Sequence, residues 1–197
     1  SRQDLDPMAA TTFGVGEMIK DAIGRGIRHF IIGIGGSATN DGGTGMLTAL
    51  GYEFLDAKGK PVGPGGQCLE KIASVSDKNR IPALDECVFQ IACDVENPLC
   101  GPHGATYIYG PQKGVTEDLL PVLDRGMNNY GHIAEAFTGK STMSTAGSGA
   151  SGGLGFAFVT FLNGTLKSGT DLILEAIALE TAIEGADFVI TGEGRLD

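Results

Sequence analysis

Residues 31–43 read Ile-Ile-Gly-Ile-Gly-Gly-Ser-Ala-Thr-Asn-Asp-Gly-Gly, an apolar run that ends in a loop of small and polar residues. The run His29 to Ile34 has the continuous apolar character of a strand that is covered on both faces in a parallel sheet. Glycines in the loop lack a Cβ atom and permit positive φ, so that successive N–H groups can converge on an anion such as phosphate. The alternative is that the glycines only make a tight connection from a strand to a helix.

Two further apolar runs, Val88 to Cys93 and Phe188 to Thr191, have the same character. Between the strands, apolar residues at helical spacing predict helices over residues 13–25, 44–50, 68–72, 116–137 and 170–185. Thr12 is expected to cap the first helix, and residues 52–62 are typical of a hairpin. Helices that alternate with buried strands predict an α/β fold, with a largely parallel sheet and helices on both faces. Ligands are then expected at the carboxyl ends of the strands.

Charged residues follow the predicted strands. Asp94, Glu193 and Asp197 each lie just past a strand, where carboxylates can converge on Mg²⁺ that bridges nucleotide phosphates. The alternative role for these residues is to cap the helices that follow. Lys113 and Arg195 can neutralise phosphoryl charge or hold a substrate carboxylate, and the alternative is that they are solvated surface charges.

Two glycine-rich segments, residues 33–38 and 140–155, each allow more than one interpretation. Gly33-x-Gly35-x-x-Ala38 matches the dinucleotide fingerprint, and Glu53 lies at the usual distance downstream. The match is poor, because residues 37–45 disfavour the helix that such a loop must open. No Walker-type sequence is present, which excludes a P-loop kinase. Residues 140–155, rich in Ser, Thr, Gly and Ala, fit a flexible connector and a ligand-binding loop equally well.

The composition bounds the class of protein. A length of 197 residues with 42% hydrophobic content is typical of one globular domain. The net charge of −10 and the lack of any Lys/Arg run argue against nucleic acid and anionic membranes as partners. No signal-peptide pattern or apolar run of membrane-spanning length is present. The cysteines lack a C-x-x-C pair and are expected to be free thiols, which fits a reducing cytoplasm: Cys68, Cys87, Cys93 and Cys100.

Four motifs in this order carry a resemblance to one family. They are Ile-Gly-Ile-Gly-Gly-Ser-Ala-Thr-Asn-Asp-Gly-Gly at residues 32–43, Ala-Cys-Asp-Val-Glu-Asn-Pro-Leu at 92–99, Gly-Pro-Gln-Lys-Gly at 110–114 and Ile-Thr-Gly-Glu-Gly-Arg-Leu-Asp at 190–197. The chain is similar along essentially its whole length to the bacterial type I glycerate kinases. Members of that family are about twice as long. Residues 1–197 are therefore expected to be the central part of such an enzyme, mainly one α/β domain of a two-domain fold, without the native N-terminal segment and the C-terminal part.

The resemblance also implies roles for the loop after the first strand. Donors to phosphate or to the substrate carboxylate would come from Gly35, Gly36, Ser37, Gly42 and Gly43. Asn40 and Asp41 would face the same cavity, with Asp41 as the catalytic carboxylate that accepts or orients the proton of the glycerate hydroxyl. The alternative for Asp41 is an Asx-type cap of the turn.

The function that the resemblance implies is the phosphorylation of D-glycerate by ATP with Mg²⁺, in the cytoplasm, with 2-phosphoglycerate as the favoured product. Lys113, Arg195 and Asp41 would be its catalytic residues. The oligomeric state stays open, with a homodimer as one candidate. Two other functions also stay open: a non-catalytic module that binds a small anion or a nucleotide, and an NAD-linked oxidoreductase.

Overall fold

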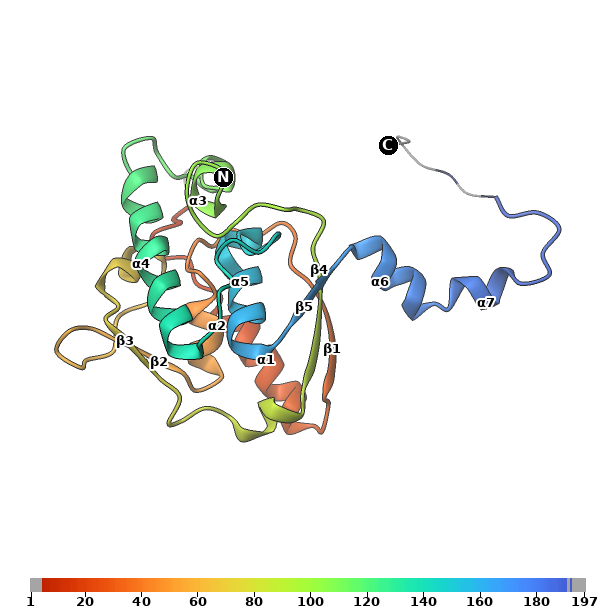
Figure 1. The fold of residues 1–197 in the computed structure, drawn as a ribbon, viewed down its shortest axis with the longest axis horizontal. Helices are drawn as coiled ribbons and strands as arrows, with labels where there is room; N and C mark the ends of the chain where they lie inside the picture. Colours follow the sequence, from red (N-terminus) through yellow and green to blue (C-terminus); the bar gives the residue numbers. More distant parts are fainter. Residues whose placement is uncertain (1–4, 191, 193–197) are drawn as a thin grey trace.

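A parallel sheet lies along one side of the compact body (Figure 1). The computed structural model describes residues 5–190 and 192 of the chain. Over these residues the sheet has three strands in the order β1-β4-β5. β1 (His29–Gly33) pairs with β4 (Val88–Ala92) along its whole length, and β5 (Thr165–Lys167) pairs with the end of β4. The carboxyl ends of the strands therefore meet at one edge, where open parallel sheets bind ligands.

Helices lie on one side of this sheet (Figure 1). They are α1 (Phe13–Gly24), α2 (Thr44–Ala49), α4 (Leu120–Thr138) and α5 (Ala150–Leu162). Along β4, every second side chain points toward these helices. Two of these side chains, Phe89 and Ile91, are fully buried. The Phe89 ring lies 5.8 Å from that of Phe158 on α5, centroid to centroid. Sheet and helices thus share one apolar core, and its burial is the main stabilising contribution to the fold.

Short elements complete the compact body. β2 (Glu53–Leu55) and β3 (Ser74–Ser76) form an antiparallel pair. Short helices connect the rest: η2 (Gly66–Lys71), η3 (Pro82–Glu86), α3 (Ala105–Tyr109) and η4 (Pro111–Lys113). The predicted hairpin at residues 52–62 is only a single bridge, between Leu55 and Pro61, because β2 takes β3 as its partner.

The C-terminal segment projects away from the body (Figure 1). The single helix predicted for residues 170–185 is two helices, α6 (Gly169–Ala176) and α7 (Leu179–Ile183). They are separated at Ala178, which has a φ of 49°. A right-handed helix needs negative φ, so the helix cannot continue through this residue. The strand predicted from Phe188 is wrong over the residues described there, because 188–190 are exposed and unpaired. The third place in the sheet belongs to β5 instead.

The α/β class and the parallel sheet are confirmed, and two details differ from expectation. The second face of the sheet is not covered by any described helix, since Ile31 is 57% and Val88 47% exposed. Thr12 makes no cap hydrogen bond to α1, because its hydroxyl is bonded to Asp41 and Met46. Within the described ranges, no helix combines the length and apolarity needed to cross a membrane.

Candidate active site

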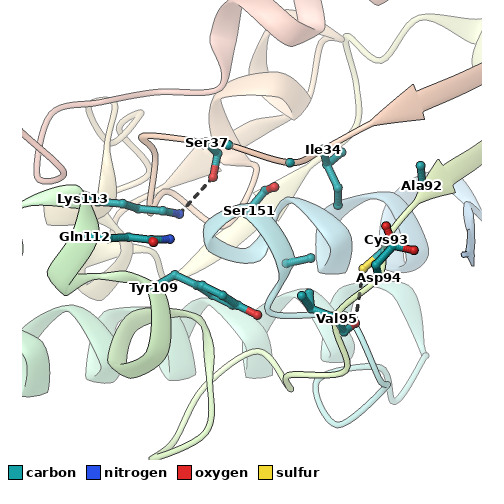
Figure 2. Close-up of a pocket in the computed structure, with 13 residues that line it drawn as sticks. Ile34, Ser37, Ala92, Cys93, Asp94, Val95, Tyr109, Gln112, Lys113 and Ser151 are labelled. Atoms are coloured by element: carbon teal, nitrogen blue, oxygen red, sulfur yellow. Dashed lines mark hydrogen bonds between the residues drawn. The ribbon is translucent and has the colours of Figure 1, made fainter. Parts of the chain in front are cut away.

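A cavity of about 240 Å³ lies at the carboxyl edge of the sheet (Figure 2). Four separate parts of the sequence surround it: the loop after β1, the loop after β4, the end of α3 with the adjoining η4, and the turn that opens α5. The lining residues are Ile34, Gly35, Gly36, Ser37, Ala92, Cys93, Asp94, Val95, Tyr109, Gln112, Lys113, Ala150 and Ser151. The predicted location of a ligand site thus coincides with a real cavity.

The glycines after β1 leave space on the cavity side. A Cβ atom added to Gly35 or Gly36 would meet no heavy atom within 4 Å, and Gly36 has a φ of 69°. Gly36 therefore holds a conformation that side chains disfavour, and both residues leave their backbone accessible to a ligand.

Lys113 supplies a buried positive charge at the cavity. Lys113 is the last residue of η4, and it is only 3% exposed. This single turn begins at Pro111 and is ended by Gly114, which has a φ of 95°. The Nζ atom donates to Ser37 Oγ at 3.0 Å and to the Thr39 carbonyl at 2.7 Å. Burial lowers the pKa of Lys113 to about 8, against a smaller opposing effect of Asp41. An ammonium group has three donors, and the described residues accept two of them, which leaves one for an anionic ligand.

Asp94 is the carboxylate among the described residues that line the cavity. It follows β4, and its Oδ1 accepts a hydrogen bond of 2.8 Å from the Gly169 N–H at the start of α6. This contact is at the N-terminus of α6, and not at the next helix along the chain, which was the alternative role expected for Asp94. The part of the chain that the structure describes contains no group of three or more His, Cys, Asp or Glu that could hold a metal. Glu193 and Asp197, the other predicted ligands, and Arg195 lie outside the described residues.

Asp41 is fully buried and does not line the cavity. Its Oδ2 accepts hydrogen bonds from the Thr12 N–H at 2.8 Å, the Thr12 hydroxyl at 2.9 Å, the Thr11 hydroxyl at 3.3 Å and the Gly45 N–H at 3.3 Å. Its Oδ1 accepts from the Gly43 N–H at 3.1 Å. These bonds satisfy the N-terminus of α2 and tie it to the start of α1. The geometry favours the turn-capping role of Asp41 over the catalytic one.

The other predicted residues of this loop also lie beneath the cavity. Asn40 is fully buried and donates to Thr106 Oγ1 at 3.0 Å. A Cβ atom on Gly42 would lie 2.6 Å from the Tyr130 ring, and one on Gly43 would lie 2.4 Å from Ala157 Cβ. Both glycines have positive φ, so they are required by close packing rather than by a ligand in the cavity.

The polar side chains of Tyr109, Gln112 and Ser151 also line the cavity and were not among the predicted site residues. The Tyr109 hydroxyl is held by Asn97, to whose Oδ1 it donates at 2.5 Å. For Ser151, the signal in the sequence is the glycine pair 152–153 that follows it, which is typical of a left-handed turn. The same turn favours the ligand-binding alternative for residues 140–155, whose last part forms one wall of the cavity.

The loop after β1 does not have the geometry of a dinucleotide-binding motif. Its residues run without helix from Ile34 to Gly43, and α2 begins only at Thr44. In the dinucleotide motif the helix opens directly at the glycines and its N-terminus holds the pyrophosphate. This arrangement argues against the oxidoreductase alternative.

Comparison with known proteins agrees with this geometry. The sequence model described as the glycerate kinase family matches residues 1–197. Glycerate kinase of Bacillus subtilis (strain 168) is 48% identical over 98% of this chain and 50% of its own length. Glycerate 2-kinase of Escherichia coli (strain K12) is 43% identical over the same shares.

A solved structure has the same fold. The crystal structure described as "putative glycerate kinase 2" from Salmonella typhimurium LT2 superimposes with a TM-score of 0.94 at 42% identity. The match covers 99% of this chain and 52% of that one. This chain therefore spans about half the length of the relatives that it matches.

Proposed function

This chain belongs to the glycerate kinase family, and on that premise we propose that the protein carrying it transfers phosphate from ATP to D-glycerate. The observation that carries the proposal is the cavity at the carboxyl edge of the sheet, where the Lys113 ammonium meets the Ser37 hydroxyl. The relatives named glycerate kinase and glycerate 2-kinase support this substrate, and the second name favours 2-phosphoglycerate as the product.

The size and charge of the cavity suit a small organic acid. Its volume of about 240 Å³ is below the ~300–1,000 Å³ of pockets that enclose drug-sized ligands. The part of the site that this chain forms therefore has room for a small acid such as glycerate. Glycerate is an anion, and the buried Lys113 gives it a local positive charge in a chain whose net charge is −10. Phosphoryl transfer depends mainly on positioning and charge neutralisation, and a fixed ammonium group supplies both.

The residues present fit a magnesium ion that is held mainly by its substrate. Mg²⁺ in phosphoryl-transfer sites is bound by one or two carboxylates together with substrate phosphates and waters. Asp94 would supply one carboxylate, through Oδ2, which makes no hydrogen bond to a described residue. When bound, the ion neutralises charge on the phosphates. Glu193 and Asp197 as further ligands, and Arg195 as a second cation, stay predictions.

The domain organisation is part of the same proposal. Residues 1–197 would form most of one α/β domain and one wall of a cleft, and a second domain would supply the other wall. The half-length match to the relatives supports this division, as does the open second face of the sheet at Ile31 and Val88.

A coupled assay tests the activity. The full-length protein is incubated with ATP, Mg²⁺ and D-glycerate, and enolase converts any 2-phosphoglycerate to phosphoenolpyruvate. A product that needs added phosphoglycerate mutase before enolase can act would be 3-phosphoglycerate, and would correct only the position of transfer. If neither product forms, the kinase proposal is wrong. Calorimetry that shows ATP binding unaffected by Mg²⁺ would then favour the non-catalytic binding module.

A further inference from the structure

The turn that opens α5 has an unusual backbone. Ser151, Gly152 and Gly153 are left-handed in succession, with φ values of 54°, 67° and 89°. Serine pays a steric cost there that glycine does not. Within the described residues, Asn163 and Ala178 are the other non-glycine residues with positive φ. Neither of them lines the cavity.

Close packing explains the glycines of the turn. The Gly152 carbonyl accepts a hydrogen bond of 2.9 Å from the Gly42 N–H. A Cβ atom on Gly152 would lie 2.1 Å from the Thr39 carbonyl oxygen, and one on Gly153 would lie 2.8 Å from Gly42 Cα. The turn is therefore fixed, backbone against backbone, on the loop that follows β1.

Packing does not explain the serine. Its backbone conformation is one that glycine adopts more easily, yet residue 151 carries a side chain. The Ser151 hydroxyl makes no hydrogen bond to another described residue, and the side chain is half-buried at the wall of the cavity. Figure 2 shows it among the residues that surround the cavity, together with Ser37 and Lys113. Strained residues of this kind concentrate at ligand sites, where the strain is retained for function.

The donors around the cavity suit a carboxylate. Ser37 Oγ accepts from Lys113 Nζ, which leaves the Ser37 hydroxyl hydrogen to donate elsewhere. Lys113 has one unused hydrogen after its bonds to Ser37 and Thr39. Ser151 adds a third donor from a different segment. Three donors, one of them cationic, match the acceptor oxygens of a small organic acid.

We propose that Ser151 is a substrate-binding residue whose hydroxyl donates a hydrogen bond to the carboxylate of the acid in this cavity. The proposal rests on the proposed function, because it assigns the acid to the same site. It places a specificity contact on α5, in addition to those of the loop after β1 and of η4.

The variant Ser151→Gly tests this role without disturbing the fold. Glycine suits the left-handed backbone, so the melting temperature should stay the same or rise. The KM for D-glycerate should increase about tenfold to a hundredfold, the effect of one hydrogen bond to a charged group. The KM for ATP should change less than twofold. Ala178→Gly is the matched control, since it relieves the same backbone strain away from the cavity and should leave both constants unchanged.

The outcomes separate this inference from the proposed function. If the wild-type protein makes no phosphoglycerate, the proposed function fails and the inference fails with it. If the wild type is active and Ser151→Gly keeps its KM for D-glycerate, only the assignment of Ser151 is wrong. An equal rise in the KM for ATP, or a melting temperature well below that of the wild type, would also overturn it.

Discussion

At the scale of single residues, Lys113 brings a buried positive charge to the candidate site. Its side chain is buried, and it lines the cavity where we propose that an anion binds. Because desolvation lowers its pKa to about 8, the charge that the anion needs is lost just above neutral pH. Activity should therefore depend on pH in a way that this one residue explains.

We predict that kcat/KM for D-glycerate falls as the pH rises through about 8, since this ratio reports ionisation in the free enzyme. In Lys113→Arg the fall should disappear, because guanidinium keeps its proton. Steady-state rates between pH 6.5 and 9.5 check this. A bound anion stabilises the protonated ammonium group and so raises its pKa. The pH at which kcat falls should therefore be higher than the pH at which kcat/KM falls. Identical profiles in the wild type and in Lys113→Arg would contradict the assignment.

The same pKa makes a prediction about stability. The folded-state value of about 8 lies below the ordinary value of 10.5, so folding releases a proton between these two pH values. The free energy of unfolding of the wild type should therefore rise with pH across that window, relative to Lys113→Met, which has no such group. Urea unfolding at pH 7.5 and pH 10 measures the difference. If the difference in the free energy of unfolding between the two proteins is the same at both pH values, the lowered pKa of Lys113 is wrong.

Asp41 should matter for stability more than for chemistry. Its carboxylate accepts five hydrogen bonds, and Asp41→Asn would replace one acceptor oxygen with an NH2 donor that faces backbone and hydroxyl donors. We expect a loss of about 2–4 kcal/mol in the free energy of unfolding. Asp56→Asn is the control, since half-buried Asp56 accepts from only Lys58 and Lys60 in a surface turn. An Asp41→Asn protein of wild-type stability with a large loss of kcat would restore the catalytic interpretation.

At the scale of elements, the packing of α1 on α2 holds the loop that follows β1. A Cβ atom on Gly16 would lie 2.3 Å from the Met46 carbonyl oxygen and 2.7 Å from Ala49 Cβ. Gly16→Ala should therefore cost about 1–3 kcal/mol of stability through overpacking. Gly14→Ala, on the same helix, would meet no atom within 4 Å and should be neutral or stabilise by up to about 1 kcal/mol. Chemical denaturation of the two variants checks this, and equal effects would contradict the packing.

The same scale shows why some strands are predictable from the sequence. In β1 and β4, the apolar run reflects core-facing side chains such as Phe30, Phe89 and Ile91. The run at residues 188–190 is equally apolar but is not paired in the described structure, because apolar character does not specify a partner. β5 has the sequence Thr-Leu-Lys, which does not indicate a strand by itself. It is a strand because it pairs with β4.

At the scale of the whole molecule, the sequence predicts the position of the candidate cavity, but only some of the residues that line it. The rule that ligands bind at the carboxyl edge of a parallel sheet located the cavity, and Gly35, Gly36, Ser37, Asp94 and Lys113 lie around it. A loop sequence does not tell which polar residues point outward, so it could not separate Ser37 from Asp41. Ser151 reaches the cavity from a distant segment, which depends on how α5 packs against the β1 loop.

The most direct measurement is the rate of 2-phosphoglycerate formation by the full-length protein with Lys113 replaced by Met. Lys140→Met is the matched control, because Lys140 also bonds to backbone carbonyls, those of Val159 and Thr160, but does not line the cavity. With equal amounts of folded protein, we predict that Lys113→Met lowers kcat/KM for D-glycerate at least a hundredfold, about 3 kcal/mol, while Lys140→Met stays near the wild type. Wild-type kinetics in Lys113→Met would contradict the claim that this cavity is the site of phosphoryl transfer.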